Sequence, residues 1–153
     1  MSLLVCTGPI SSGTRLLYNI VNGNFHIKAE HRSMPQWDDF WSWSDDPPGS
    51  KYIVITRRPD ISVRSALKQG HGDPKLRGWE KRTHKADPDE LAEWWWRAIR
   101  ILATIPGAYW MSYEALVASP VTQVDNLAAW LGVAEVTYPT IYDGNAKWLA
   151  RLS

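Results

Sequence analysis

Short apolar runs alternate with amphipathic stretches along the chain. Apolar, β-branched and aromatic residues cluster in residues 3–6, 25–30, 51–56 and 108–113, a pattern typical of strands. Helical spacing of apolar residues follows the third run to about Gln69 and recurs in residues 120–131. Strands separated by helices predict an α/β fold, a three-layer domain with a central parallel sheet of four or five strands.

The longest predicted helix follows Asp87, which is suited to the N-cap position before Pro88, and it stops at Pro106. A last short helix is expected around residues 146–152. Residues 70–88 are polar and basic, and we interpret them as a mobile loop or lid. Residues 36–50 form a second long loop, expected to contain one helical turn. Its tryptophans either line an acceptor pocket or cover the sheet.

Composition indicates one domain spanning residues 1–153, because 153 residues with 44% apolar content can bury their own core. The single cysteine, Cys6, falls in the first apolar run, which favours a buried, reduced thiol. The chain starts without the basic segment of a signal peptide, and no apolar run is long enough to cross a membrane. We therefore expect a soluble, cytoplasmic protein without a membrane partner.

Charge is distributed unevenly although the net charge is only +1. Residues 57–85 hold nine Lys and Arg against three acids, with His71 and His84 in addition. This excess predicts a local anionic partner, and a solvated charged loop is the alternative. The overall balance argues against a nucleic-acid-binding domain.

A glycine-containing loop follows the first strand, with Gly8 and Gly13 five residues apart. Such a loop can direct backbone N–H groups at a phosphate or a sulfate, and a turn without a ligand is the alternative. The pattern is nearly the P-loop GxxxxGK[ST]. Thr14 replaces its lysine and Arg15 replaces its magnesium-binding hydroxyl, which disfavours an ordinary nucleoside triphosphatase.

Arg57 comes directly after the third predicted strand. Ligands of parallel α/β sheets bind at the carboxyl ends of the strands. Ser65 is expected about two turns into the next helix, so that its hydroxyl and the guanidinium of Arg57 can meet on one phosphate.

These motifs make the chain resemble the PAPS-dependent sulfotransferases, which transfer a sulfuryl group from 3′-phosphoadenosine 5′-phosphosulfate. The family's phosphosulfate loop reads P-K/R-S-G-T-T, and Pro9 is followed two residues later by Ser11-Ser12-Gly13-Thr14-Arg15. The family's 3′-phosphate motif is matched by Arg57, Pro59 and Ser65. A third stretch, residues 113–120 and 126–132, is similar to the family's Y-E-D-L … P … L-x-x-F-L-G segment.

The resemblance implies transfer to an acceptor hydroxyl or amine, with PAPS as cosubstrate, 3′,5′-ADP as product and no metal. It implies that Arg57 and Ser65 hold the 3′-phosphate. The loop would hold the 5′-phosphosulfate through its backbone and the hydroxyls of Ser12 and Thr14. The loop residues that this assigns to the cosubstrate are Gly8, Pro9, Ser11, Ser12, Gly13, Thr14 and Arg15.

Ser11 is the main departure, because the family has a Lys or Arg there that stabilises the transferring group. Arg15 or a basic residue of the segment 70–85 is expected to replace that charge. If neither does, the protein is a degenerate module that binds the nucleotide without transferring a sulfuryl group. A P-loop kinase that acts on a nucleotide or a small molecule is a separate alternative.

The base that activates the acceptor is the second open point. We favour His31, because the ordinary pKa of histidine suits a general base, with Glu30 and Ser33 as alternatives.

Overall fold

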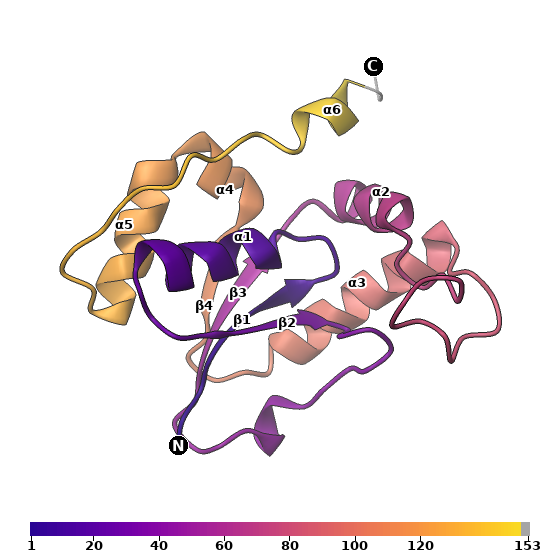
Figure 1. Ribbon diagram of the computed structural model, residues 1–153, viewed down its shortest axis with the longest axis horizontal. Helices are drawn as coiled ribbons and strands as arrows, with labels where there is room; N and C mark the ends of the chain where they lie inside the picture. The colour runs from indigo at the N-terminus through magenta and orange to yellow at the C-terminus, as the bar shows by residue number, and fades with distance from the viewer. Residues whose placement is uncertain (151–153) are drawn as a thin grey trace.

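Four parallel strands form the centre of the computed structural model, which describes residues 1–150 (Figure 1). Their spatial order is β2-β1-β3-β4. The strands are β1 (Leu4–Pro9), β2 (Glu30–Met34), β3 (Lys51–Thr56) and β4 (Tyr109–Ser112). The predicted α/β fold with a central parallel sheet of four or five strands is therefore confirmed, and the sheet has four.

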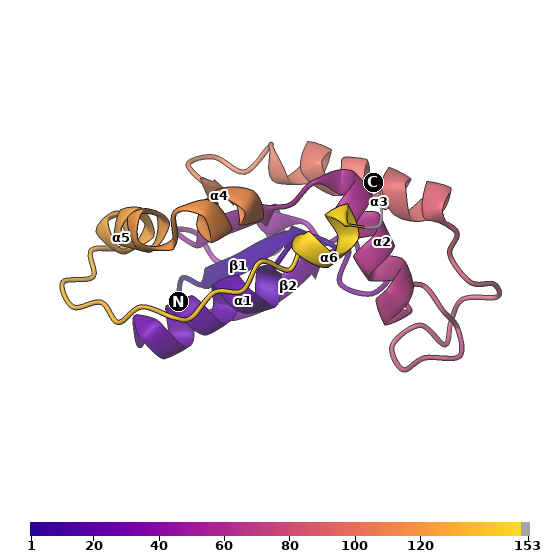
Figure 2. The ribbon, with the colours of Figure 1, turned by 90° about the horizontal axis from the view of Figure 1, so that it is seen from above.

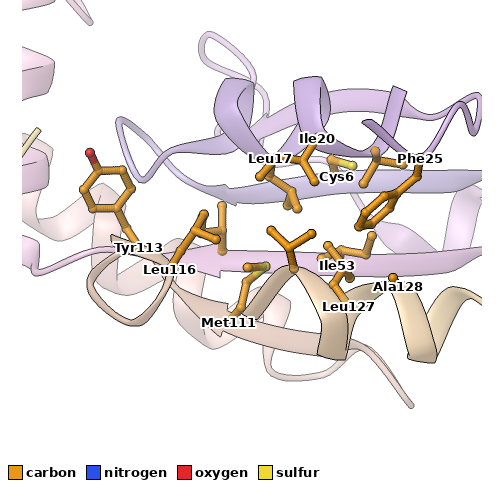
Figure 3. Packing of buried hydrophobic residues seen from close by; sticks show 13 residues of the cluster. Cys6, Leu17, Ile20, Phe25, Ile53, Met111, Tyr113, Leu116, Leu127 and Ala128 are labelled. Atoms are coloured by element: carbon orange, nitrogen blue, oxygen red, sulfur yellow. The ribbon is translucent and has the colours of Figure 1, made fainter. Parts of the chain in front are cut away.

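Alternating residues of the strands divide the core between two faces of the sheet. On one face Cys6 and Ile53 pack against α1 (Thr14–Asn19), α4 (Tyr113–Ala118) and α5 (Pro120–Leu131), as Figure 3 shows, and Ile55 belongs to the same cluster. On the other face Tyr52 and Val54 pack against α3 (Pro88–Leu102). Figure 2 shows the resulting three layers, with α1 and α3 on opposite sides of the strands.

A third cluster joins α2 (Pro59–Gln69) and α3 to the loop between them. Residues 70–87 contain neither helix nor strand, as predicted for a loop. Trp79 of this loop is buried and stacks on Trp94, with ring centroids 5.8 Å apart. Arg82 forms a 2.6 Å salt bridge to Glu90. Within residues 1–150, no helix has the length and apolar character that crossing a lipid bilayer requires.

The second strand was predicted wrongly at residues 25–30, because β2 begins at Glu30. The π-helical segment η1 (Ile20–Asn24) extends α1, and Phe25 caps it with its side chain in the core. The alternation of apolar residues there reflects loop residues packed onto the core. β2 lies at an edge of the sheet and is mostly polar, so it lacks the apolar pattern that identifies buried strands.

The remaining predicted elements agree with the structure. The loop before β3 contains one short 3₁₀ turn, η2 (Trp43–Asp45). Asp87 caps α3, and its side chain accepts a 2.8 Å hydrogen bond from the backbone N–H of Glu90. The last helix, α6 (Ala146–Leu149), starts where it was expected, and the predicted end at Leu152 lies outside the described residues.

Replacing Gly8 with alanine is expected to destabilise the fold by about 1–3 kcal/mol, because the new methyl group would overpack the core. An added Cβ at Gly8 would lie only 2.1 Å from the carbonyl oxygen of Ile55 on the neighbouring strand. Gly23→Ala is the matched control, since a Cβ there meets no atom within 4 Å. Urea denaturation measures both variants, and equal midpoints would contradict this account of Gly8.

Candidate functional site

A pocket of about 290 Å³ opens where the carboxyl ends of β1, β2 and β3 meet. This edge of a parallel sheet is where ligands of α/β proteins bind. Residues from the loop after β1, from β2, from the end of β3 and from the end of α2 contribute to its wall. They are Ser11, Gly13, Thr14, Arg15, His31, Ser33, Arg57, Ser65, Gln69 and His71.

The loop after β1 turns sharply into α1. Ser11 and Gly13 have φ angles of 52° and 96°, in the left-handed region. Ser12, between them, is fully buried. Its N–H donates a 3.2 Å hydrogen bond to the carbonyl of Pro9, and its Oγ lies 3.4 Å from the Oγ of Ser62 on α2.

Three of the predicted loop ligands do not line the pocket. Gly8 and Pro9 are the last two residues of β1, and Pro9 has no N–H to offer. Ser12 uses its N–H and its hydroxyl within the protein, as described above. The loop residues that reach the pocket are thus Ser11, Gly13, Thr14 and Arg15.

Arg57 lies at the end of β3 and is 9% exposed. Its Nε donates a 2.6 Å hydrogen bond to Oδ1 of Asn145, and its Nη1 donates a 3.3 Å bond to the carbonyl of Ser11. Its guanidinium lies over the ring of Tyr113, 4.6 Å from the centroid. Burial lowers the pKa of Arg57, which nevertheless stays protonated at neutral pH.

Among residues 1–150, no carboxylate forms a salt bridge with Arg57. The two hydrogen bonds use two of the five N–H groups of the guanidinium. The other N–H groups and the positive charge remain for an anion in the pocket. Asn145 was missed by sequence reasoning, because it is 88 residues away from Arg57 and lies in a segment without a recognisable pattern.

Ser65 and Ser11 are connected through the side chain of Gln69. The Ser11 hydroxyl donates a 3.1 Å hydrogen bond to Oε1 of Gln69, and Nε2 of Gln69 lies 3.4 Å from the Ser65 Oγ. Nε2 of His71 lies 3.2 Å from the same Oε1. Sequence analysis did not single out Gln69, and it noted His71 only as part of a basic segment.

His31 is a residue of β2, paired in register with Cys6. Its Nε2 lies 2.8 Å from the hydroxyl of Thr14, and its ring is tilted against that of Tyr18 with centroids 5.8 Å apart. Burial and then the positive charge of Arg15 lower the pKa of His31. The imidazole is therefore neutral at pH 7 and has a lone pair that can accept a proton.

The two alternatives to His31 differ from it in environment. Glu30 does not line the pocket, and its carboxylate forms a 2.6 Å salt bridge with Arg32. Ser33 lines the pocket, but its hydroxyl donates a 3.0 Å hydrogen bond to the carbonyl of Pro35. Of the three residues, His31 is the one that combines a place in the pocket with a basic atom.

The wall of the pocket is positive, since it includes Arg15 and Arg57 and no Asp or Glu. Arg15 is exposed at the start of α1. Its guanidinium has no hydrogen-bond or salt-bridge partner in the part of the chain that the structure describes. An anionic ligand would thus meet two arginines and several hydroxyl groups.

A second and larger pocket of about 630 Å³ shares His31 with the first. It lies beside the loop between β2 and β3, and Trp41 is the one tryptophan of that loop in its wall. The other residues of its wall are Arg32, Gln36, Asp39, Phe40, Ser42, Asp45 and Asp46. A group bound there would approach His31 from outside the positive pocket.

Comparisons with known proteins agree with this architecture. Neither a family model nor a curated protein matches the sequence. Among solved structures, the chain is similar to the crystal structure of mouse sulfotransferase SULT7A1 complexed with PAP, with a TM-score of 0.53 and 12% sequence identity. The chain has a sulfotransferase-like fold. The similarity covers 98% of this chain and 62% of the mouse sulfotransferase chain.

Ser11, which the sequence resemblance sets opposite the family's loop cation, carries no charge. Its left-handed backbone and its hydrogen bond to Gln69 direct its hydroxyl toward the end of α2. The positive charge near the loop comes instead from Arg15, one residue into α1.

Proposed function

We propose that this chain is a PAPS-dependent sulfotransferase, which transfers a sulfuryl group to an acceptor hydroxyl or amine. The observation that carries the proposal is the positive pocket, which gathers Arg15, Thr14, His31, Arg57 and Ser65 at the ends of three strands without a carboxylate. The fold it shares with a sulfotransferase supports the proposal further.

In this proposal the two phosphate-bearing groups of PAPS occupy adjacent parts of the pocket. The 3′-phosphate accepts hydrogen bonds from the free N–H groups of Arg57 and from the hydroxyl of Ser65. The 5′-phosphosulfate lies against Ser11, Gly13, Thr14 and Arg15. A buried, preorganised arginine holds a phosphate well, and among residues 1–150 no carboxylate forms a salt bridge with Arg57.

The reaction is an in-line displacement at sulfur. The acceptor oxygen or nitrogen forms a bond to sulfur while the bond from sulfur to the phosphate oxygen breaks, and the acceptor's proton passes to His31. Because Nε2 of His31 contacts the Thr14 hydroxyl, Nδ1 is the nitrogen left to take this proton, and His31 also lines the second pocket, where the acceptor would bind. Arg15 stabilises the charge that develops on the leaving phosphate oxygen. Positioning of the reactants and electrostatic stabilisation of the transition state account for the rate of such a transfer.

A nucleotide-binding module without activity is the second candidate, and Ser11 is the observation that favours it. A P-loop kinase is a weaker alternative, since the loop offers neither the phosphate-binding lysine nor the magnesium-binding hydroxyl. A kinase would need magnesium and would tolerate the loss of Arg57.

The test is release of 3′,5′-ADP from PAPS by the purified protein, with a panel of small alcohols, phenols and amines as acceptors and with EDTA present. We expect turnover that depends on the acceptor and that magnesium does not increase. Background release with every acceptor, together with tight binding of 3′,5′-ADP, would leave the binding module. Transfer from ATP that requires magnesium would replace the proposal with a kinase.

A further inference from the structure

One titratable side chain on the pocket wall has no role in the function proposed above. His71 follows α2 directly and faces the pocket together with Gln69 and Ser65. Its ring packs edge-on against the buried Trp79, with centroids 5.8 Å apart. Because Trp79 stacks in turn on Trp94 of α3, the imidazole is held in place by the core.

The hydrogen bond of His71 defines which nitrogen carries the hydrogen of the neutral ring. Oε1 of Gln69 can only accept, so the hydrogen of the neutral ring resides on Nε2. Nδ1 is buried and has no hydrogen-bond partner among the described residues. A second proton on Nδ1 would therefore lack an acceptor within the described part of the protein.

The charged groups on the pocket wall favour an anion beside His71. No carboxylate lines the pocket. The groups that share the wall with His71 are Ser11 and Arg15 from the loop after β1, His31 from β2, Arg57 from the end of β3, and Ser65 and Gln69 from α2. Burial alone lowers the pKa of His71, and no charged side chain contributes to this shift.

We propose that His71 is an additional ligand for a phosphate monoester in this pocket, and that it becomes protonated when the anion binds. The inference rests on the proposed function and adds a proton-dependent cation to it. Gln69 alone separates His71 from Ser11, through contacts of 3.1 and 3.2 Å to the same Oε1. A protonated His71 thus places positive charge near Ser11, the loop residue that carries none.

The direction of the pH dependence follows from linkage. An anion beside the ring favours the charged form, so the pKa of His71 is higher in the complex than in the free protein. The extra affinity is present below the free-state pKa and is lost as the pH rises through the pKa of the complex. If the pKa of His71 is one unit higher in the complex than in the free protein, the affinity gained at low pH is about tenfold.

Nuclear magnetic resonance tests the inference directly, because the chain has only four histidines. The pKa of each imidazole is measured in the free protein, with 3′,5′-ADP and with inorganic phosphate. We expect the pKa of His71 to rise by about 1 to 3 pH units with ligand. The resonances of His26 and His84, which do not line the pocket, should not respond to either ligand.

Calorimetry at pH 5.5 and pH 8 adds a second readout. The ratio of the 3′,5′-ADP affinity at pH 5.5 to that at pH 8 should be about tenfold smaller for His71→Asn than for the wild type. His84→Asn, which lies outside the pocket, is the matched control and should behave as the wild type. The phosphate itself titrates near pH 6 in every variant, so the difference between variants isolates His71.

The outcomes separate this inference from the proposed function. If 3′,5′-ADP binds while the pKa of His71 stays constant, the inference is overturned and the function stands. If 3′,5′-ADP does not bind but inorganic phosphate raises the pKa of His71, the function fails and the inference stands. If neither ligand changes the pKa of His71, the inference is overturned as well.

Discussion

Replacing Arg15 with alanine is expected to lower the release of 3′,5′-ADP from PAPS by about 10²- to 10³-fold, the usual effect of removing one well-placed electrostatic donor. Arg15 lines the pocket, and within residues 1–150 its guanidinium has no other partner. The affinity for 3′,5′-ADP should fall by a smaller factor, because this product keeps the 5′-phosphate oxygen that Arg15 stabilises but lacks the transferring sulfuryl group. Turnover assays and calorimetry on the same preparation measure both effects.

Ser11→Lys is the matched control for Arg15→Ala. If Arg15 supplies the catalytic charge, a lysine at position 11 should raise turnover little. It would also have to adopt the left-handed backbone of Ser11, where φ is 52°. The opposite pattern, with unchanged turnover for Arg15→Ala and a rise of about 10²-fold for Ser11→Lys, would show that the loop had lost its cation without replacement.

Replacing Arg57 with alanine is expected to weaken 3′,5′-ADP binding by about ten- to a hundredfold, the range for losing a charge-assisted hydrogen bond of about 1.5–3 kcal/mol. The same change should destabilise the fold by about 1–3 kcal/mol, because the buried Oδ1 of Asn145 would lose its donor. Calorimetry and urea denaturation measure the two effects separately.

Two variants make the Arg57 experiment specific. Arg57→Lys keeps the charge but not the planar fork, and should recover part of the affinity. Arg58→Ala removes a neighbouring arginine whose side chain is 45% exposed and paired with Asp60, and should leave affinity unchanged. A folded Arg57→Ala protein with wild-type affinity would show that Arg57 only supports the structure.

The helices and strands could be predicted from the sequence wherever burial of one face gives the apolar residues a regular spacing. β3 has four consecutive buried residues, and α2 and α5 are delimited by a proline at the start and a glycine at the end. The edge strand β2 could not be found in this way. Its polar side chains face the two pockets and the solvent instead of the core.

The candidate site was predictable only where local motifs carry it. The glycine loop and the strand-end position of Arg57 pointed to residues that the structure brings to one pocket wall. Asn145 reaches Arg57 through a segment without periodicity, and Gln69 reaches Ser11 across 58 residues of chain. Such contacts depend on how the elements pack, which no local pattern encodes.

The most direct test of the central claim is calorimetric comparison of 3′,5′-ADP with 5′-ADP, each with EDTA and with magnesium. The account predicts that 3′,5′-ADP binds at least about tenfold more tightly, since only this nucleotide carries the 3′-phosphate for Arg57 and Ser65. Magnesium should not change that preference. Equal affinities, or tighter binding of 5′-ADP that requires magnesium, would contradict the claim that this pocket recognises a 3′-phosphorylated nucleotide.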